Sequence, residues 1–177
     1  MRPFCATLVI SLCILSSGAS RADKGEWQMA AGLGTHILVT SNGSTSTTQL
    51  APTLQLGVAY AITDYWQLAI QLYGGAEVLQ EKGPGGFAQA LIEARFVLDA
   101  LTWVPYLSVG FGTTVRDNPA PDATATDATA HLGIGVDYRP KRKWSIGLDA
   151  RYNFLLTDFK GTTGPIQTTL TFKLYLD

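Results

Sequence analysis

The residues of this chain that could do chemistry are few, and its two histidines, His36 and His131, are the first to consider. A histidine next to a serine can activate the serine hydroxyl as a nucleophile. The polar candidates near the histidines are Ser41, Ser44 and Asp127. No His-x-Ser pair is present, because Leu38 and Gly133 occupy the positions two residues on, so a Ser–His pair would have to form across strands. Two histidines without cysteines or clustered carboxylates also make a poor metal site. We therefore interpret both histidines as rim residues near the long connections, where they hydrogen-bond the loops, and we predict no catalytic, cofactor or metal residues.

A set of charged residues falls on the polar face of stretches in which apolar and polar residues alternate. We predict that these residues form an interior polar network. Its members are Glu93, Arg95, Asp137, Asp149, Arg151 and Lys173. Charges enclosed in a narrow space must be paired, since an isolated buried charge is prohibitively costly. We expect Asp149 to lie near Lys173, with Glu93, Arg95 and Arg151 in the same network. The favoured role is a polar core that fixes strand register, ahead of a gate or an ion path.

The elements that would position these side chains are eight stretches in which apolar and polar residues alternate. A strand points successive side chains to opposite faces, so this period-two pattern predicts strands with one apolar and one polar face. Residues 87–99 are ambiguous, because on propensity alone they could form a helix. The predicted strands are 27–39, 50–62, 66–77, 87–98, 103–115, 129–139, 144–156 and 166–176.

The connections alternate between long and short. Long, polar connections are predicted at Thr40–Gln49, Val78–Gly86, Arg116–Ala128 and Thr157–Pro165. Tight turns are predicted at Thr63–Tyr65, Asp99–Thr102 and Pro140–Lys143. Long loops at one end and short turns at the other are typical of an outer-membrane β-barrel.

The four tryptophans recur about every forty residues, and each opens one of the alternating stretches. If consecutive strands run antiparallel, all four indoles lie at one level beside the short turns. A membrane–water interface favours such a ring, because indole is apolar but its N–H seeks water. The predicted interfacial ring comprises Trp27, Trp66, Trp103, Trp144, Tyr60 and Tyr138.

The N-terminus resembles a secretory signal peptide. Arg2 precedes an apolar run of about twelve residues, which is shorter than the ~20 that a spanning helix needs. We predict a signal at residues 1–22 and a single β-barrel domain at residues 23–177, with cleavage after Ala22 or Ala19. Both cysteines, Cys5 and Cys13, lie in the signal.

Composition narrows the class of protein further. Without the signal, 11 basic and 14 acidic residues remain, a net charge of about −3, so there is no basic surface for nucleic acid. Charged residues make up 15% of the 177-residue chain, below the ~25% that is usual for soluble domains. Low charge together with 18 glycines fits a protein whose outer surface contacts lipid.

Alternation alone leaves open which face points outward, and a lipocalin-like barrel would place its apolar face inside. Glycine and alanine gather on the polar face, however, and an eight-stranded barrel has an interior only wide enough for side chains. The apolar face carries no charge in the strand middles, where each charge would cost ~2–4 kcal/mol in lipid. We therefore predict an all-β fold, an eight-stranded antiparallel up-and-down transmembrane β-barrel with its apolar face outward.

The segment LGIGVDYRPKRKWSIGLDARYNF, residues 132–154, joins a glycine-spaced strand, a charged tight turn and an aromatic-opened strand. With the pattern of the whole chain, it resembles the small outer-membrane β-barrels of the OmpA and OmpX types. The resemblance implies location in the outer membrane of a Gram-negative-type bacterium, contact with its lipids and lipopolysaccharide, and insertion by the barrel-assembly machinery. Such proteins usually end in an aromatic residue, whereas this chain ends Tyr175, Leu176, Asp177.

The expected function is that of a non-enzymatic envelope protein with a plugged polar interior, in which the long loops contact a partner that the sequence does not identify. Three alternatives remain open. They are a narrow porin-like channel for small solutes or ions, a barrel enzyme that modifies lipid A, and a soluble lipocalin-like carrier.

Overall fold

The computed structural model describes residues 24–42, 45–79, 83–98, 102–117, 124–156 and 162–176. The predicted signal at residues 1–22 lies outside these ranges. The described residues form eight strands: β1 (Trp27–Asn42), β2 (Thr45–Ala61), β3 (Trp66–Leu79), β4 (Gly83–Val97), β5 (Trp103–Asp117), β6 (Thr124–Lys141), β7 (Trp144–Leu155) and β8 (Thr162–Leu176). Among the described residues there is no helix long and apolar enough to span a membrane.

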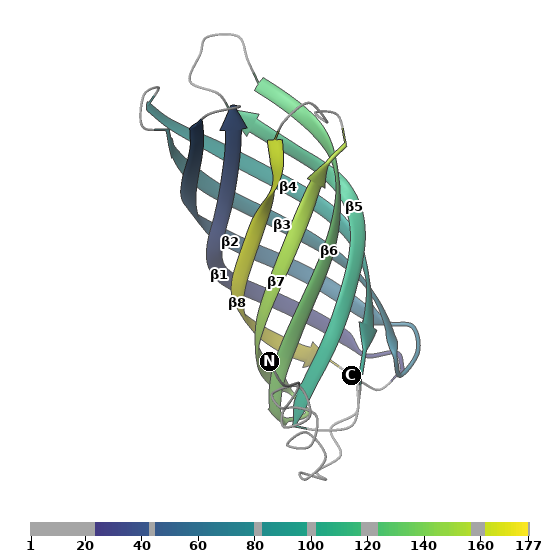
Figure 1. Ribbon diagram of the computed structural model, residues 1–177. Helices are drawn as coiled ribbons and strands as arrows, with labels where there is room; N and C mark the ends of the chain where they lie inside the picture. The colour runs from purple at the N-terminus through teal and green to yellow at the C-terminus, as the bar shows by residue number, and fades with distance from the viewer. Residues whose placement is uncertain are drawn as a thin grey trace, which may run out of the picture.

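The strands form a closed barrel in sequence order, each antiparallel to its neighbours (Figure 1). The seam is an antiparallel ladder between β1 and β8, in which Trp27 lies opposite Leu176 and the register shifts between Ile37 and Val39. Closure leaves no unpaired sheet edge, so every strand has a hydrogen-bonded neighbour on both sides. The predicted fold is confirmed, and the ambiguous stretch 87–99 contributes to strand β4 and not to a helix.

The four strands that open with a tryptophan begin where predicted, but most of the eight strands extend further than predicted at the opposite end of the barrel. The four tryptophans start β1, β3, β5 and β7. Much of each predicted long connection is strand: β2 begins at Thr45 and β6 at Thr124. The segments that begin at Thr45 and Thr124 are rich in threonine, which suits a strand as well as a loop, and the hairpin ladders continue through them. The predicted long loops are therefore too long.

The turns between β2 and β3 and between β6 and β7 are short, as predicted, and residues 99–101 of the third predicted turn lie outside the described residues. In the turn between β2 and β3, the Thr63 hydroxyl accepts hydrogen bonds from the backbone N–H groups of Tyr65 (3.2 Å) and Trp66 (3.0 Å). Such a side-chain-to-backbone bond fixes a turn in place of a strand ladder. Pro140, which was predicted in the turn between β6 and β7, is instead the next-to-last residue of β6.

Burial follows the two-residue period and separates the two faces of the wall. Outward residues are apolar and exposed, with Leu33 at 70% and Phe111 at 65% of their full exposure. Inward residues include Gln71 and Asn153, both fully buried. The apolar face of the barrel therefore points outward and the polar side chains fill its middle, which is the arrangement that the alternation favoured.

Candidate functional site

The buried charged side chains of the described strands lie on four of them and come mostly in pairs two residues apart. Because residues i and i+2 share a strand face, β4 places Glu93 beside Arg95, and β7 places Asp149 beside Arg151. All four side chains are buried. The Arg151 Nε lies 3.0 Å from Asp149 Oδ1, and Arg95 Nε forms an ion pair with Glu93 Oε1.

Glu93 is the centre of this cluster. Its Oε2 lies 3.0 Å from Arg151 Nη1 and 3.1 Å from His131 Nε2, while its Oε1 pairs with Arg95. One carboxylate thus joins two guanidinium groups and an imidazole from β4, β6 and β7. With Asp149 as the second acid, two negative and two positive side chains balance one another, as burial requires.

Gly110 explains how Glu93 on β4 meets His131 on β6, although β5 lies between these strands. Glu93 and His131 are both ladder partners of Gly110. A Cβ at Gly110 would overlap the His131 ring and the backbone of Ile92. Glycine at this position therefore opens a passage through which polar groups from two non-adjacent strands touch.

Gly147 plays the same part for a second ion pair, between Lys173 of β8 and Asp137 of β6. The Lys173 Nζ lies 2.7 Å from Asp137 Oδ2, and a Cβ at Gly147 on the intervening β7 would overlap Asp137. Lys173 was expected near Asp149, and its ion-pair partner is Asp137. Asp149 instead binds Arg151 on its own strand, and Lys173 reaches over the glycine.

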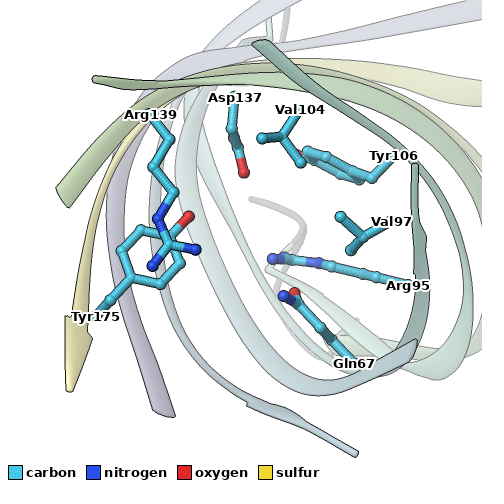
Figure 2. Close-up of a pocket in the computed structure, with 8 residues that line it drawn as sticks. All are labelled: Gln67, Arg95, Val97, Val104, Tyr106, Asp137, Arg139 and Tyr175. Atoms are coloured by element: carbon cyan, nitrogen blue, oxygen red, sulfur yellow. The ribbon is translucent and has the colours of Figure 1, made fainter. Parts of the chain in front are cut away.

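A third cluster lies at the short-turn end and is centred on Arg139. Its guanidinium donates a hydrogen bond to Glu26 (2.6 Å) and another to the backbone carbonyl of Arg142 (2.6 Å), and it stacks 3.6 Å from the centre of the Tyr175 ring. The Tyr175 hydroxyl also shares a 2.9 Å hydrogen bond with Ser145. Figure 2 shows Arg139 lying over the Tyr175 ring. This cluster ties together the start of β1, the turn after β6 and the last strand.

The prediction from the sequence did not include Glu26 or the stacking of Tyr175. Glu26 lies just before the first strand, and extending the alternation one residue ahead of Trp27 would have placed it inward with Gln28. The cavity beside this cluster holds about 10 Å³, close to the minimum for one water molecule. It is lined by Gln67, Arg95, Val97, Val104, Tyr106, Asp137, Arg139 and Tyr175 (Figure 2).

Two apolar clusters lie on either side of the Glu93 cluster along the barrel. One comprises Ala51, Tyr73, Phe87 and Leu91, and the other comprises Val97, Val104 and Tyr106. Along β4 the order is Phe87, Leu91, Glu93, Arg95 and Val97, so the charges lie between these two apolar clusters. The Tyr73 ring lies 5.1 Å from the Arg151 guanidinium, and the Tyr106 ring lies 5.4 Å from that of Arg95. In the barrel interior, the guanidinium groups of the ion pairs therefore also contact tyrosine rings.

The histidines are not at the rim, contrary to the interpretation that they hydrogen-bond the loops. His131 is buried against Glu93, and His36 is buried with its ring 4.4 Å from that of Phe87. Ser44 and the side chain of Ser41 lie outside the part of the chain that is described. Among the described residues, no group of three or more His, Cys, Asp or Glu side chains is placed to hold a metal ion.

The six aromatic residues of the predicted ring lie outward at the short-turn end. Trp27 contacts Tyr60 with ring centres 4.9 Å apart, and Trp103 contacts Tyr138 at 4.8 Å. The other two rest on phenylalanines that the prediction did not include: Trp66 on Phe96 at 5.1 Å and Trp144 on Phe172 at 6.2 Å. In each pair the rings are offset or tilted, the geometries that aromatic pairs prefer.

The comparisons with known proteins agree with this architecture. The sequence model of a family described as "Outer membrane protein beta-barrel domain" matches residues 6–174. The chain belongs to this family. Its apolar wall accordingly faces lipid in an outer membrane, and its polar side chains face the barrel interior.

Several solved structures share this fold at low sequence identity. The outer membrane protein OprG from Pseudomonas aeruginosa superimposes with a TM-score of 0.63 at 11% identity, covering 90% of this chain and 99% of OprG. Neisserial surface protein A gives 0.62 at 13% identity, covering 86% and 99%. The N-terminal β-barrel domain of P. aeruginosa OprF gives 0.61 at 16% identity, covering 86% and 98%. No curated protein sequence matches the chain significantly.

Proposed function

We propose that this outer-membrane protein is a non-enzymatic component of the envelope whose interior is closed to solutes and whose loops meet the surroundings. The observation that carries the proposal is the Glu93 cluster, which lies in the barrel interior between the two apolar clusters. A conducting pore of this strand number would need that space open, yet side chains alone fill it. The role we assign is structural or in surface interaction, through the hairpins at the end opposite the tryptophans.

The arrangement of the histidines argues against lipid A chemistry. A Ser–His nucleophile needs the two side chains within hydrogen-bond reach. In the described part of the chain, no hydrogen bond joins either histidine to a serine, and His131 is engaged by a carboxylate that also binds two arginines. We further propose that β8, whose outward face carries Leu170, Phe172, Leu174 and Leu176, is the strand that the assembly machinery reads, and that the wall contacts membrane lipids and lipopolysaccharide.

Planar-bilayer recording of the purified full-length chain tests closure. We expect no stable current steps, because an ion would have to break the Glu93 ion pairs and pass a lumen that side chains fill. The same preparation should migrate differently on a gel before and after boiling, which shows that the barrel under test is folded. Uniform, long-lived conductance steps from the folded protein would support the narrow-channel alternative and overturn the proposal.

A further inference from the structure

Cations outnumber acids among the exposed charged side chains whose burial the structure describes. These side chains are Lys24, Asp64, Lys141, Arg142 and Lys143. Four of these five are cations, and three of the cations are consecutive in the connection between β6 and β7. We call Lys141, Arg142 and Lys143 the basic turn.

The basic turn is held by its backbone. The Arg142 carbonyl accepts a hydrogen bond of 2.6 Å from the buried Arg139, and the Lys143 carbonyl accepts one of 3.0 Å from the backbone N–H of Tyr175. Arg139 is itself fixed by Glu26 and by the Tyr175 ring. Two backbone carbonyls of the turn are therefore held by the body of the barrel.

The turn is also at the level of the aromatic ring. Lys141 is the ladder partner of Trp144, whose indole packs on Phe172 at the outer surface. In an outer-membrane barrel, outward indoles mark the boundary between hydrocarbon and headgroups. Three cations at that boundary lie at the depth of lipid phosphates.

We propose that the basic turn, with Trp144, binds the headgroup of an anionic phospholipid in the leaflet at the short-turn end. Clustered Lys and Arg side chains next to a spanning segment attract anionic headgroups, and each contributes about a factor of five to the affinity near such a surface. The indole packs along the upper acyl chain while the cations meet the phosphate. This inference concerns a lipid at the outer wall and does not depend on whether the lumen conducts.

The barrel contains its own control on the opposite wall. Trp66 opens β3, which is four strands from β7 in either direction around the closed sheet. The turn that precedes Trp66 carries Asp64 as its charged residue and no cation. Trp144 and Trp66 therefore lie at comparable depth beside turns of opposite charge.

Single-tryptophan proteins test the proposal directly. One keeps Trp144 (W27F, W66F, W103F) and the other keeps Trp66 (W27F, W103F, W144F). Each is folded into phosphatidylcholine vesicles that contain a minor fraction of brominated phosphatidylglycerol or brominated phosphatidylcholine, since bromine quenches a nearby indole. We expect about fivefold or greater enrichment of the anionic lipid at Trp144, weakened by salt, and no enrichment at Trp66.

Two changes to the turn separate charge from shape. K141Q, R142Q and K143Q together should abolish the enrichment at Trp144, whereas K141R, R142K and K143R together should keep it. Phospholipid retained by the otherwise unaltered protein and by these two variants, after extraction in mild detergent, gives a second readout that needs no tryptophan changes. Equal quenching at both tryptophans, or unchanged anionic lipid retention in the glutamine variant, would overturn the proposal.

Discussion

Replacing Glu93 with glutamine should destabilise the folded barrel by about 3–5 kcal/mol, the cost of leaving buried charges without their partner. Glu93 is the shared partner of Arg95 and Arg151, and none of the three side chains is exposed to water. The substitution keeps the shape of the side chain but removes its charge. The guanidinium groups of Arg95 and Arg151 then share Asp149, which pairs with Arg151, as their remaining acid among the contacts described above. Urea-induced unfolding of the barrel in lipid vesicles measures the loss.

A second substitution shows whether charge imbalance is the cause. In the double variant E93Q/R95M, Asp149 and Arg151 remain as a balanced pair, and methionine fills the space left by the arginine side chain. The double variant should therefore be more stable than E93Q alone. D64N, which neutralises an exposed turn residue, should change stability by no more than about 0.5 kcal/mol. If E93Q were as harmless as D64N, the ion-paired core would not be what holds the interior together.

Replacing Ile70 with arginine should cost about 2–4 kcal/mol, because it places a charge on the lipid-facing wall. Ile70 lies in β3, four residues above Trp66, and its side chain is 59% exposed to the outside. In a protein whose outer wall met water, the same change at an exposed position would be nearly neutral. The same unfolding measurement in vesicles provides the value.

Ile62 offers a matched control on the same hairpin. It is exposed to a similar extent, 47%, but lies in the turn between β2 and β3, below the aromatic ring. I62R should cost about 0–1 kcal/mol, since the penalty for a charge falls towards the interface. Equal costs at Ile62 and Ile70 would mean that the two positions do not differ in their exposure to hydrocarbon.

The two-residue period predicted the strands, their faces and their ends on the tryptophan side because each depends on local sequence. A strand turns every second side chain to the same side, so the Trp144 strand shows its two faces without reference to any other segment. Strand ends at the far side were harder to place. Threonine-rich segments such as that from Thr45 suit both loops and strands, and only pairing across the hairpin decides between them.

The individual contacts inside the barrel depend on more than height along a strand. Lys173 was expected to meet Asp149, yet Asp137 is its partner because Gly147 leaves a gap across the strand between them. His131 was interpreted as a rim residue, but Gly110 admits it to Glu93. These pairings depend on glycines in the strand that lies between the two partners. Analysing one strand at a time does not reveal them.

The sequence analysis also did not predict the two apolar clusters inside the barrel, and β4 shows the reason. Its inward face carries Phe87, Leu91 and Val97 as well as the charged pair, and its outward face is apolar throughout. Alternation is therefore weak in this strand, which is why the stretch could pass for a helix on propensity. A strand that has apolar residues on both its outward and its inward face loses the alternation of apolar and polar residues by which strands are recognised.

The most direct test of the central claim, that the apolar face meets lipid and the polar face fills the barrel, is a nitroxide scan of residues 67–72 in β3. Single cysteines are introduced in a C5S, C13S background, labelled, and the folded protein is placed in vesicles. Accessibility to oxygen, which concentrates in hydrocarbon, should peak at Leu68, Ile70 and Leu72 and fall at the residues between them. Peaks at Gln67, Ala69 and Gln71 instead, or no alternation, would contradict the claim.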